Sequence, residues 1–240
     1  MKTMLCVLAA CLAAAPAAAE DFILWHGENV QILRGVDYEL GDRERTILTV
    51  EHAHRSRWGD VFLFADFTRG DDGQRAAYGE ITPRLSLSRT TGQGWSFGPV
   101  SDVYLAGNFE FGDEGLDRQL YGVAVDLDAP GFVFLRAHAF RRDDPDRPGS
   151  TWQATFAWNR PFTLGDQRFL FEGFADIAGA EGPGVANQLT APRLLWNLPG
   201  RDGTAGSLWL GLEHQYWNNK FGVDGVRESV TQLQLKWVAG

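Results

Sequence analysis

Hydrophobic and polar side chains alternate along most of this chain with the period of two that is typical of a β-strand. In residues 151–159, Trp152 and Trp158 fall on one face and Gln153 falls on the other. Residues 132–140 place an aliphatic face opposite a face of aromatic and charged side chains. A charged face is poorly suited to a dry core, so the two faces of these strands are expected to meet different solvents.

The alternation recurs in twelve segments that are separated by turn residues, which predicts twelve strands. They span residues 29–34, 46–54, 59–68, 78–89, 101–111, 119–128, 132–141, 151–160, 167–177, 187–197, 206–217 and 228–238. Connections after odd-numbered segments are charged, whereas most of those after even-numbered segments are short turns of Pro and Gly. Pro83 and Pro192 fall inside predicted strands, and because proline lacks an N–H, bulges are expected there.

Two folds fit the alternation: a soluble β-sandwich and a membrane-spanning β-barrel. Asp, Glu and Arg recur on the inner face, where the dry core of a sandwich would need them paired or neutralised. Lipid allows a sheet to cross only if the sheet closes on itself, and strands of about ten residues suffice. Trp152 and Trp158 would be separated by about 20 Å, the spacing of two aromatic belts. We therefore predict an all-β fold, a transmembrane antiparallel up-and-down β-barrel of 12 strands.

The first residues of the chain differ from the rest. Lys2, the apolar stretch 4–15 and the small residues 17–19 predict a cleaved secretory signal peptide at residues 1–19, which leaves 20–240 as a single barrel domain. Cys11 would fit a lipid-anchor signal, but the apolar region before it is short. Both cysteines lie in this stretch, so the mature chain has neither disulfides nor cysteine chemistry. The net charge of −9 argues against nucleic acid as a partner.

Several sequence motifs resemble the nucleoside-specific channel-forming outer-membrane proteins, the Tsx/OmpK-like family. They are Tyr78-Gly-Glu-Ile-Thr-Pro-Arg-Leu-Ser-Leu87, the stretch 96–107, Gly122-Val-Ala-Val-Asp-Leu-Asp-Ala-Pro-Gly-Phe132 and the stretch 141–153. The resemblance implies a 12-stranded barrel in the outer membrane of a Gram-negative cell, a passive channel for nucleosides and deoxynucleosides, and no cofactor. It also implies lipid and the outer-membrane assembly machinery as partners, and phage or colicin at the outer loops. Such barrels usually end on an aromatic residue, whereas Trp237 is followed here by three others.

A nucleoside channel needs aromatic faces for the base and carboxylates or amides for the ribose hydroxyls. The predicted inward face supplies both kinds of group. Its candidate residues are Phe62, Phe64, Asp66, Arg84, Tyr104, Asn108, Glu110, Arg136, His138, Glu172, Phe174, Asp176, Arg193, Trp209 and Glu213. The alternative interpretation is that Arg84, Arg136 and Arg193 form a wall network with the carboxylates and that no ligand is involved.

Other functions remain open at this point, namely a porin for another small solute, an adhesin or phage receptor, and a barrel enzyme. An enzyme would need Ser, His and Asp converging at the rim or the lipid face, and no such set is found. Gly94-Trp-Ser96-Phe-Gly98 matches a nucleophile-elbow pattern but is followed by Pro99 and another strand, not by a helix. His52 and His54 share a strand face without a third metal ligand. The sequence therefore favours a channel without enzymatic activity or a metal.

Overall fold

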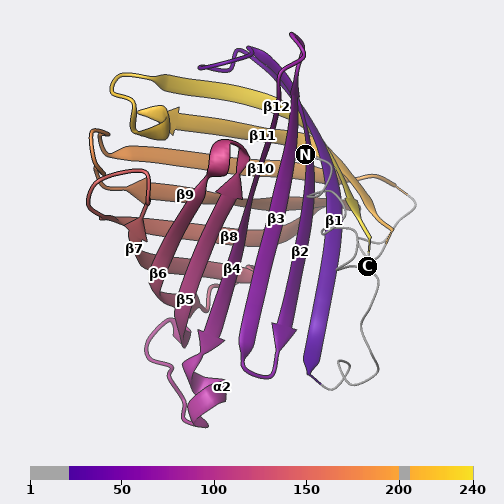
Figure 1. Cartoon of the computed structure of the whole chain (residues 1–240). Coiled ribbons are helices and arrows are strands. Elements are labelled where there is room, and N and C mark those ends of the chain that lie inside the picture. The colour runs from indigo at the N-terminus through magenta and orange to yellow at the C-terminus, as the bar shows by residue number, and fades with distance from the viewer. Residues whose placement is uncertain (1–21, 200–205, 240) are drawn as a thin grey trace.

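The computed structural model describes residues 22–199 and 206–239, and the predicted signal peptide lies outside these residues. Twelve antiparallel strands form a closed barrel in which each strand pairs with its neighbours in sequence and β1 pairs with β12 (Figure 1). The predicted fold class and strand number are therefore confirmed. The strands are β1 (Ile23–Val36), β2 (Glu44–Ser56), β3 (Gly59–Gly70), β4 (Arg75–Ser86), β5 (Val100–Gly112), β6 (Asp117–Leu127), β7 (Phe134–Asp143), β8 (Thr151–Leu164), β9 (Gln167–Ala178), β10 (Asn187–Asn197), β11 (Leu208–Asn218) and β12 (Arg227–Val238).

Three strand boundaries differ clearly from the prediction, and one of them is the end of β8, at Leu164 rather than at residue 160. β1 begins at Ile23 rather than at residue 29, and β4 ends at Ser86 rather than at residue 89. A short helix, α2 (Leu87–Thr91), follows β4 because the Ser86 side chain accepts a hydrogen bond from the backbone N–H of Arg89. Gly92, with φ of 70°, ends the helix in the left-handed conformation.

The expected bulges at the two prolines are absent, which corrects that prediction. In the β4–β5 ladder the paired residues stop at Ile81 and resume at Arg84 in the same register. In the β10–β11 ladder they stop at Thr190 and resume at Arg193, again without a shift. Each proline is still paired with the strand on its other side. The missing N–H therefore interrupts one ladder, but no extra residue is inserted.

The barrel is apolar outside and polar inside, as predicted. Outward leucines such as Leu105, Leu194 and Leu233 are about half exposed, whereas the inward Gln31 and Gln234 are fully buried. Trp152 is 55% exposed on the outer wall, in line with its predicted place in an aromatic belt. Trp158, predicted for the second belt, is instead half-buried and is among the residues that line the lumen, so its predicted place in an outer belt is corrected. It fills the space beside Gly173, where an added Cβ would lie 2.9 Å from the indole.

The barrel is flattened. Figure 1 shows β1 to β6 crossing in front of β7 to β12 at a steep angle. The two corners where these halves meet are filled with side chains. The seam corner, beside the β1–β12 pair, contains Gln31, Leu33, Val230, Gln232 and Gln234, and the opposite corner, beside β5 and β6, contains Tyr104, Ala106, Leu120, Ala124 and Phe140. The open space therefore lies between the two flattened walls.

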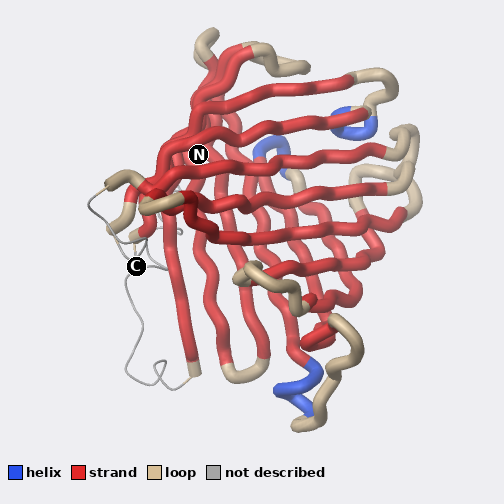
Figure 2. The backbone as a smooth tube through the Cα atoms, turned by 180° about the vertical axis from the view of Figure 1, so that it is seen from behind, coloured by secondary structure: helices blue, strands red, loops and turns tan. Residues whose placement is uncertain are grey.

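Connections after odd and even strands gather at opposite ends of the barrel. We call one end the loop rim, formed by residues 37–43, 71–74, 113–116, 144–150, 179–186 and 219–226. The other is the turn rim, which includes residues 57–58, 87–99, 128–133 and 165–166. Seen from behind in Figure 2, strands make up nearly the whole wall, and the blue α2 extends beyond it. In the described part of the chain, no helix has the length and hydropathy needed to cross a membrane.

Candidate functional site in the barrel lumen

A cavity of about 2160 Å³ occupies the lumen between the two flattened walls. All the residues predicted to face inward line it, with the exception of Tyr104. Tyr104 is buried in the corner beside β5 and β6, where its ring lies 4.1 Å below the Arg84 guanidinium and its hydroxyl donates to Asp126 at 3.0 Å. Its role is therefore to support Arg84, and the expectation that it faces the solute is corrected.

The first of two charge networks is centred on Arg84. This guanidinium donates to the carboxylates of Asp60 and Asp126, both at 2.7 Å, and is almost fully buried. Arg136 lies farther from the same two carboxylates, at 3.7 and 3.5 Å, and stacks over the Phe134 ring at 4.6 Å. Two arginines thus share two carboxylates, so that the formal charge of this network is neutral.

The second network crosses the lumen. Arg193 of β10 donates to Glu213 at 2.5 Å on the adjacent strand and reaches Glu51 of β2 at 3.1 Å. Lys236 of β12 donates to Glu172 of β9 at 2.6 Å. β2 and β10 are not neighbours in the barrel, so we call the Arg193–Glu51 contact the lumen bridge. Arg84, Arg136 and Arg193 all form ion pairs, as the alternative interpretation predicted.

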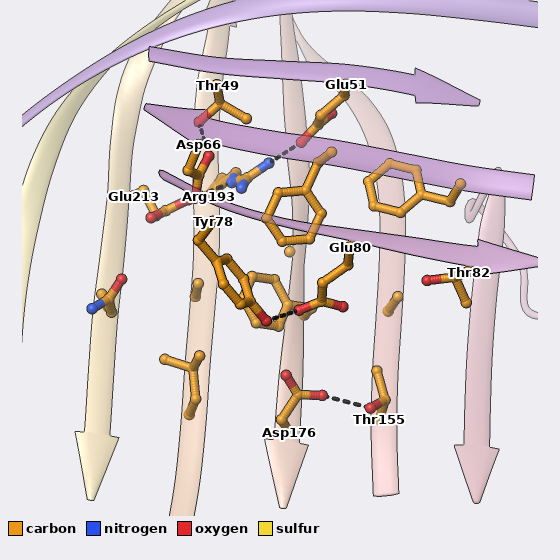
Figure 3. A pocket seen from close by; sticks show the side chains of 18 of the residues that line it. Thr49, Glu51, Asp66, Tyr78, Glu80, Thr82, Thr155, Asp176, Arg193 and Glu213 are labelled. Carbon is orange, nitrogen blue, oxygen red and sulfur yellow. Dashed lines mark hydrogen bonds and ion pairs between the residues drawn. The ribbon is translucent and has the colours of Figure 1, made fainter. Parts of the chain in front are cut away.

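Three lumen carboxylates carried by strands form no ion pair with any residue in 22–199 or 206–239: Asp66, Glu80 and Asp176. Asp66 accepts a hydrogen bond from Thr49, and Asp176 accepts one from Thr155, both at 2.5 Å. Glu80 accepts from the Tyr78 hydroxyl at 2.5 Å and from the Asn108 amide at 2.8 Å. Figure 3 shows these carboxylates around one part of the cavity.

Aromatic rings lie beside these carboxylates. The rings of Phe64 and Tyr78 are 5.8 Å apart, and Phe62 follows 6.1 Å from Phe64. We call Phe64, Asp66, Tyr78, Glu80 and Asp176 the central patch. It combines flat apolar faces with hydrogen-bond acceptors that no cation neutralises, so it can hold a flat solute that carries hydroxyl groups.

Tyr78 and Glu80 of this patch, and Glu51 of the lumen bridge, are not among the site residues predicted from the sequence. The signal was present, because Tyr78, Glu80 and Arg84 share one face of the same alternating strand. Glu51 likewise alternates with Thr49 on β2. Which of the inward carboxylates lack a cation depends on contacts between distant strands, which no local pattern reveals.

The remaining candidates lie around the central patch. His138 is buried and stacks on Phe140 with 5.4 Å between ring centroids. Trp209 is buried against Leu170 and Leu195, and its indole donates to Ser207 at 3.1 Å. Glu110 forms an ion pair with Arg118, which also donates to Asp144 at 2.8 Å. Phe174 is half-buried in the cavity wall.

Two ionic contacts, Lys220–Glu228 and Arg118–Asp144, lie toward the loop rim. Lys220 donates to Glu228 at 2.5 Å, and both residues are buried. Burial lowers the pKa of the Lys220 ammonium below its ordinary value, and the Glu228 carboxylate offsets this only in part. For Asp144, burial raises the pKa, but the hydrogen bond and charge of Arg118 lower it more. The Lys220–Glu228 and Arg118–Asp144 contacts each hold a loop residue against the end of a strand.

The two histidines of β2 lie outside the lumen. His52 and His54 are 3.0 Å apart on the outward face, and His52 also contacts Glu28 at 2.8 Å. His26 joins the same cluster, 3.1 Å from Glu28. Within the described ranges, no group of three or more acidic, His or Cys side chains converges well enough to hold a metal ion.

Comparison with known proteins gives one family match and one curated relative. Residues 24–231 match the family described as "Nucleoside-specific channel-forming protein, Tsx". Over 106 residues the chain is 27% identical to "Outer membrane protein OmpK" of Vibrio parahaemolyticus. This stretch is 43% of the chain but only 40% of that relative, so the match spans less than half of the relative's length.

Solved porin structures share the fold. "KdgM porin" has a TM-score of 0.50 at 9% identity, covering 87% of this chain and 98% of that one. A second structure, "KdgM porin in complex with disordered oligogalacturonate", has a TM-score of 0.49 at the same identity and coverage. At such identity the likeness concerns the barrel and not the solute.

Proposed function

The chain belongs to the Tsx family of nucleoside-specific channel-forming proteins, and from this premise we propose that it is an outer-membrane channel through which nucleosides and deoxynucleosides diffuse passively. The central patch is the observation that carries the proposed solute. A base can stack on Phe64 and Tyr78, and ribose hydroxyls can donate to Asp66, Glu80 or Asp176.

The two ion-pair networks support this assignment by elimination. Carboxylates that accept from Arg84 or Arg193 are less available to a neutral solute, because their charge-assisted hydrogen bonds are stronger than those a neutral hydroxyl would offer. Those of the central patch accept only from hydroxyls or amides, which a solute can replace at lower cost. Such binding stays weak, as conduction requires.

The proposal also covers export and membrane insertion. Residues 1–19 would direct the chain out of the cytoplasm and be removed, and the assembly machinery would insert the barrel into the outer membrane. The loop rim would then face outward, where phage or colicin could contact it, and the turn rim would face the periplasm. No cofactor and no enzymatic step are part of this function.

Block of single-channel current in planar bilayers tests the solute. Adenosine should interrupt the current of the wild-type channel, and Phe64→Ala or Asp66→Ala should raise the half-blocking concentration. For Phe64→Ala we expect at least about a fivefold increase, because base stacking contributes about 1–3 kcal/mol.

Phe67→Ala is the matched control. Phe67 lies on the same strand as Phe64 but on its outer face, so its loss should leave adenosine block unchanged. Unchanged block in both Phe64→Ala and Asp66→Ala would remove the central patch from the solute path. Block by neutral sugars without block by nucleosides would show a porin for another solute.

A further inference from the structure

Arg160 carries a positive charge on the outer wall of the barrel. It belongs to the outward face of β8, with Trp152 and Phe156, and is itself exposed. Among the described residues, no carboxylate forms an ion pair with its guanidinium. An unpaired arginine is costly in hydrocarbon and is tolerated where it reaches the headgroup region or meets an anion.

The guanidinium of Arg160 lies at the turn rim. It sits 5.5 Å from the ring centroid of Phe132, in the turn between β6 and β7. A Cβ added to Gly131, in the same turn, would lie 3.3 Å from the Arg160 Nε, so the glycine leaves room for the side chain. Arg160 thus extends from the strand toward the end of the barrel wall, where lipid headgroups would begin.

An apolar groove adjoins this charge. It has a volume of about 310 Å³ and is lined by Arg160 and Phe162 of β8, Phe171 of β9 and Leu194 of β10. Phe171 and Leu194 are exposed on the outer wall, and Arg160 is the only charged residue of the lining. The groove therefore runs across three adjacent strands with a cationic group at one side.

We propose that this groove binds one phospholipid, with an acyl chain against Phe162, Phe171 and Leu194 and with the phosphate at the Arg160 guanidinium. The inference rests on the proposed membrane location. The groove is continuous with the surface that faces hydrocarbon, which favours a lipid over a water-soluble ligand. Arginine pairs with phosphate through charge-assisted hydrogen bonds, which complements the one charge of the lining.

Native mass spectrometry of the detergent-solubilised full chain tests this site, with phosphatidylglycerol as the probe. The wild type should retain one phosphatidylglycerol, and Arg160→Gln should weaken retention about tenfold, the effect of losing one charge-assisted hydrogen bond. Diacylglycerol with the same acyl chains lacks the phosphate and should bind the wild type no better than phosphatidylglycerol binds Arg160→Gln.

Two further variants serve as a control for the loss of an outward arginine and as an independent test of the groove. Arg141→Gln removes an outward arginine of β7 at the opposite rim, and it should retain lipid like the wild type. Leu194→Trp keeps Arg160 but fills the groove, and it should lose the lipid even if Arg160→Gln fails to fold. Equal retention by Arg160→Gln and wild type, or by diacylglycerol and phosphatidylglycerol, would overturn the proposal.

Channel measurements separate this inference from the proposed function. If phosphatidylglycerol is retained at Arg160 but nucleosides do not block the current, only the solute assignment fails. If nucleosides block the current and Arg160→Gln retains lipid like the wild type, only the lipid site fails.

Discussion

Individual cationic residues determine which carboxylates of the lumen are neutralised and which are not. Arg193 is the cation on which the second network depends, because it faces the carboxylates of Glu51, Glu172 and Glu213 at 3.1, 3.9 and 2.5 Å. Lys236 is the only other cation of this network within the described residues. This network already holds three carboxylates against two cations, so removing the charge of Arg193 would raise its excess of negative charge from one to two.

Arg193→Gln should increase both the conductance of the open channel and its preference for cations. The lumen bridge to Glu51 would be lost, and the freed carboxylates would attract cations and repel anions. The reversal potential under a KCl gradient measures the selectivity.

Arg69→Gln is the control, since Arg69 is exposed at the loop end of β3 and does not line the cavity. An unchanged reversal potential in Arg193→Gln would show that the lumen bridge does not govern ion passage.

At the scale of elements, the prolines within strands differ in whether they cost a ladder hydrogen bond. Pro83 and Pro192 each interrupt one ladder, whereas Pro161 does not. Pro192 leaves a gap in the β10–β11 ladder. Pro161 also lies within a strand, but the β8–β9 ladder continues through it, and the β7–β8 ladder has already ended at Asn159. An N–H at position 161 would therefore have no ladder partner on that side.

Pro192→Ala should leave the free energy of unfolding unchanged or slightly raised, whereas Pro161→Ala should lower it. Losing a proline frees the unfolded chain and costs about 0.4–1 kcal/mol in both variants. Only alanine at 192 regains a ladder hydrogen bond of about 0.5–1.5 kcal/mol. Urea unfolding in lipid vesicles, followed by tryptophan fluorescence, measures the difference. Equal destabilisation of the two variants would contradict this account.

Alternation predicted the strands, their faces and closure well, because each strand meets lipid on one side and the lumen on the other. The same logic could not predict α2, since a five-residue helix is too short for a periodic pattern and depends on the Ser86 cap. Nor could it predict which inward charges are neutralised. The lumen bridge joins residues 142 positions apart, and only the flattened shape of the barrel brings them into contact.

At the scale of the whole molecule, the flattened barrel depends on its filled corners. The seam corner is neutral: the Gln234 amide donates to Gln31, and the Tyr38 hydroxyl donates to Gln232 at 2.6 Å. These groups are all buried. Neutral amides close the seam without the desolvation cost of a buried ion pair.

Gln31→Leu should lower the free energy of unfolding by about 1–3 kcal/mol, because it leaves the buried Gln234 amide without its partner. The double variant Gln31→Leu/Gln234→Leu removes both polar groups and should cost less than the sum of the two single variants. A double-mutant cycle by urea unfolding measures this coupling. Strictly additive effects would show that the two amides do not stabilise the seam together.

The seam corner also links the order of biosynthesis to the finished pore. Gln31 and Gln234 are 203 residues apart, so the groups that fill this corner are supplied by the first strand and by the last to be synthesised. A chain interrupted before β12 lacks the last strand of the wall and also Val230, Gln232 and Gln234, which fill this corner from β12. Unfinished chains would therefore not form narrower working pores, and a cell that makes this protein gains permeability only from complete copies.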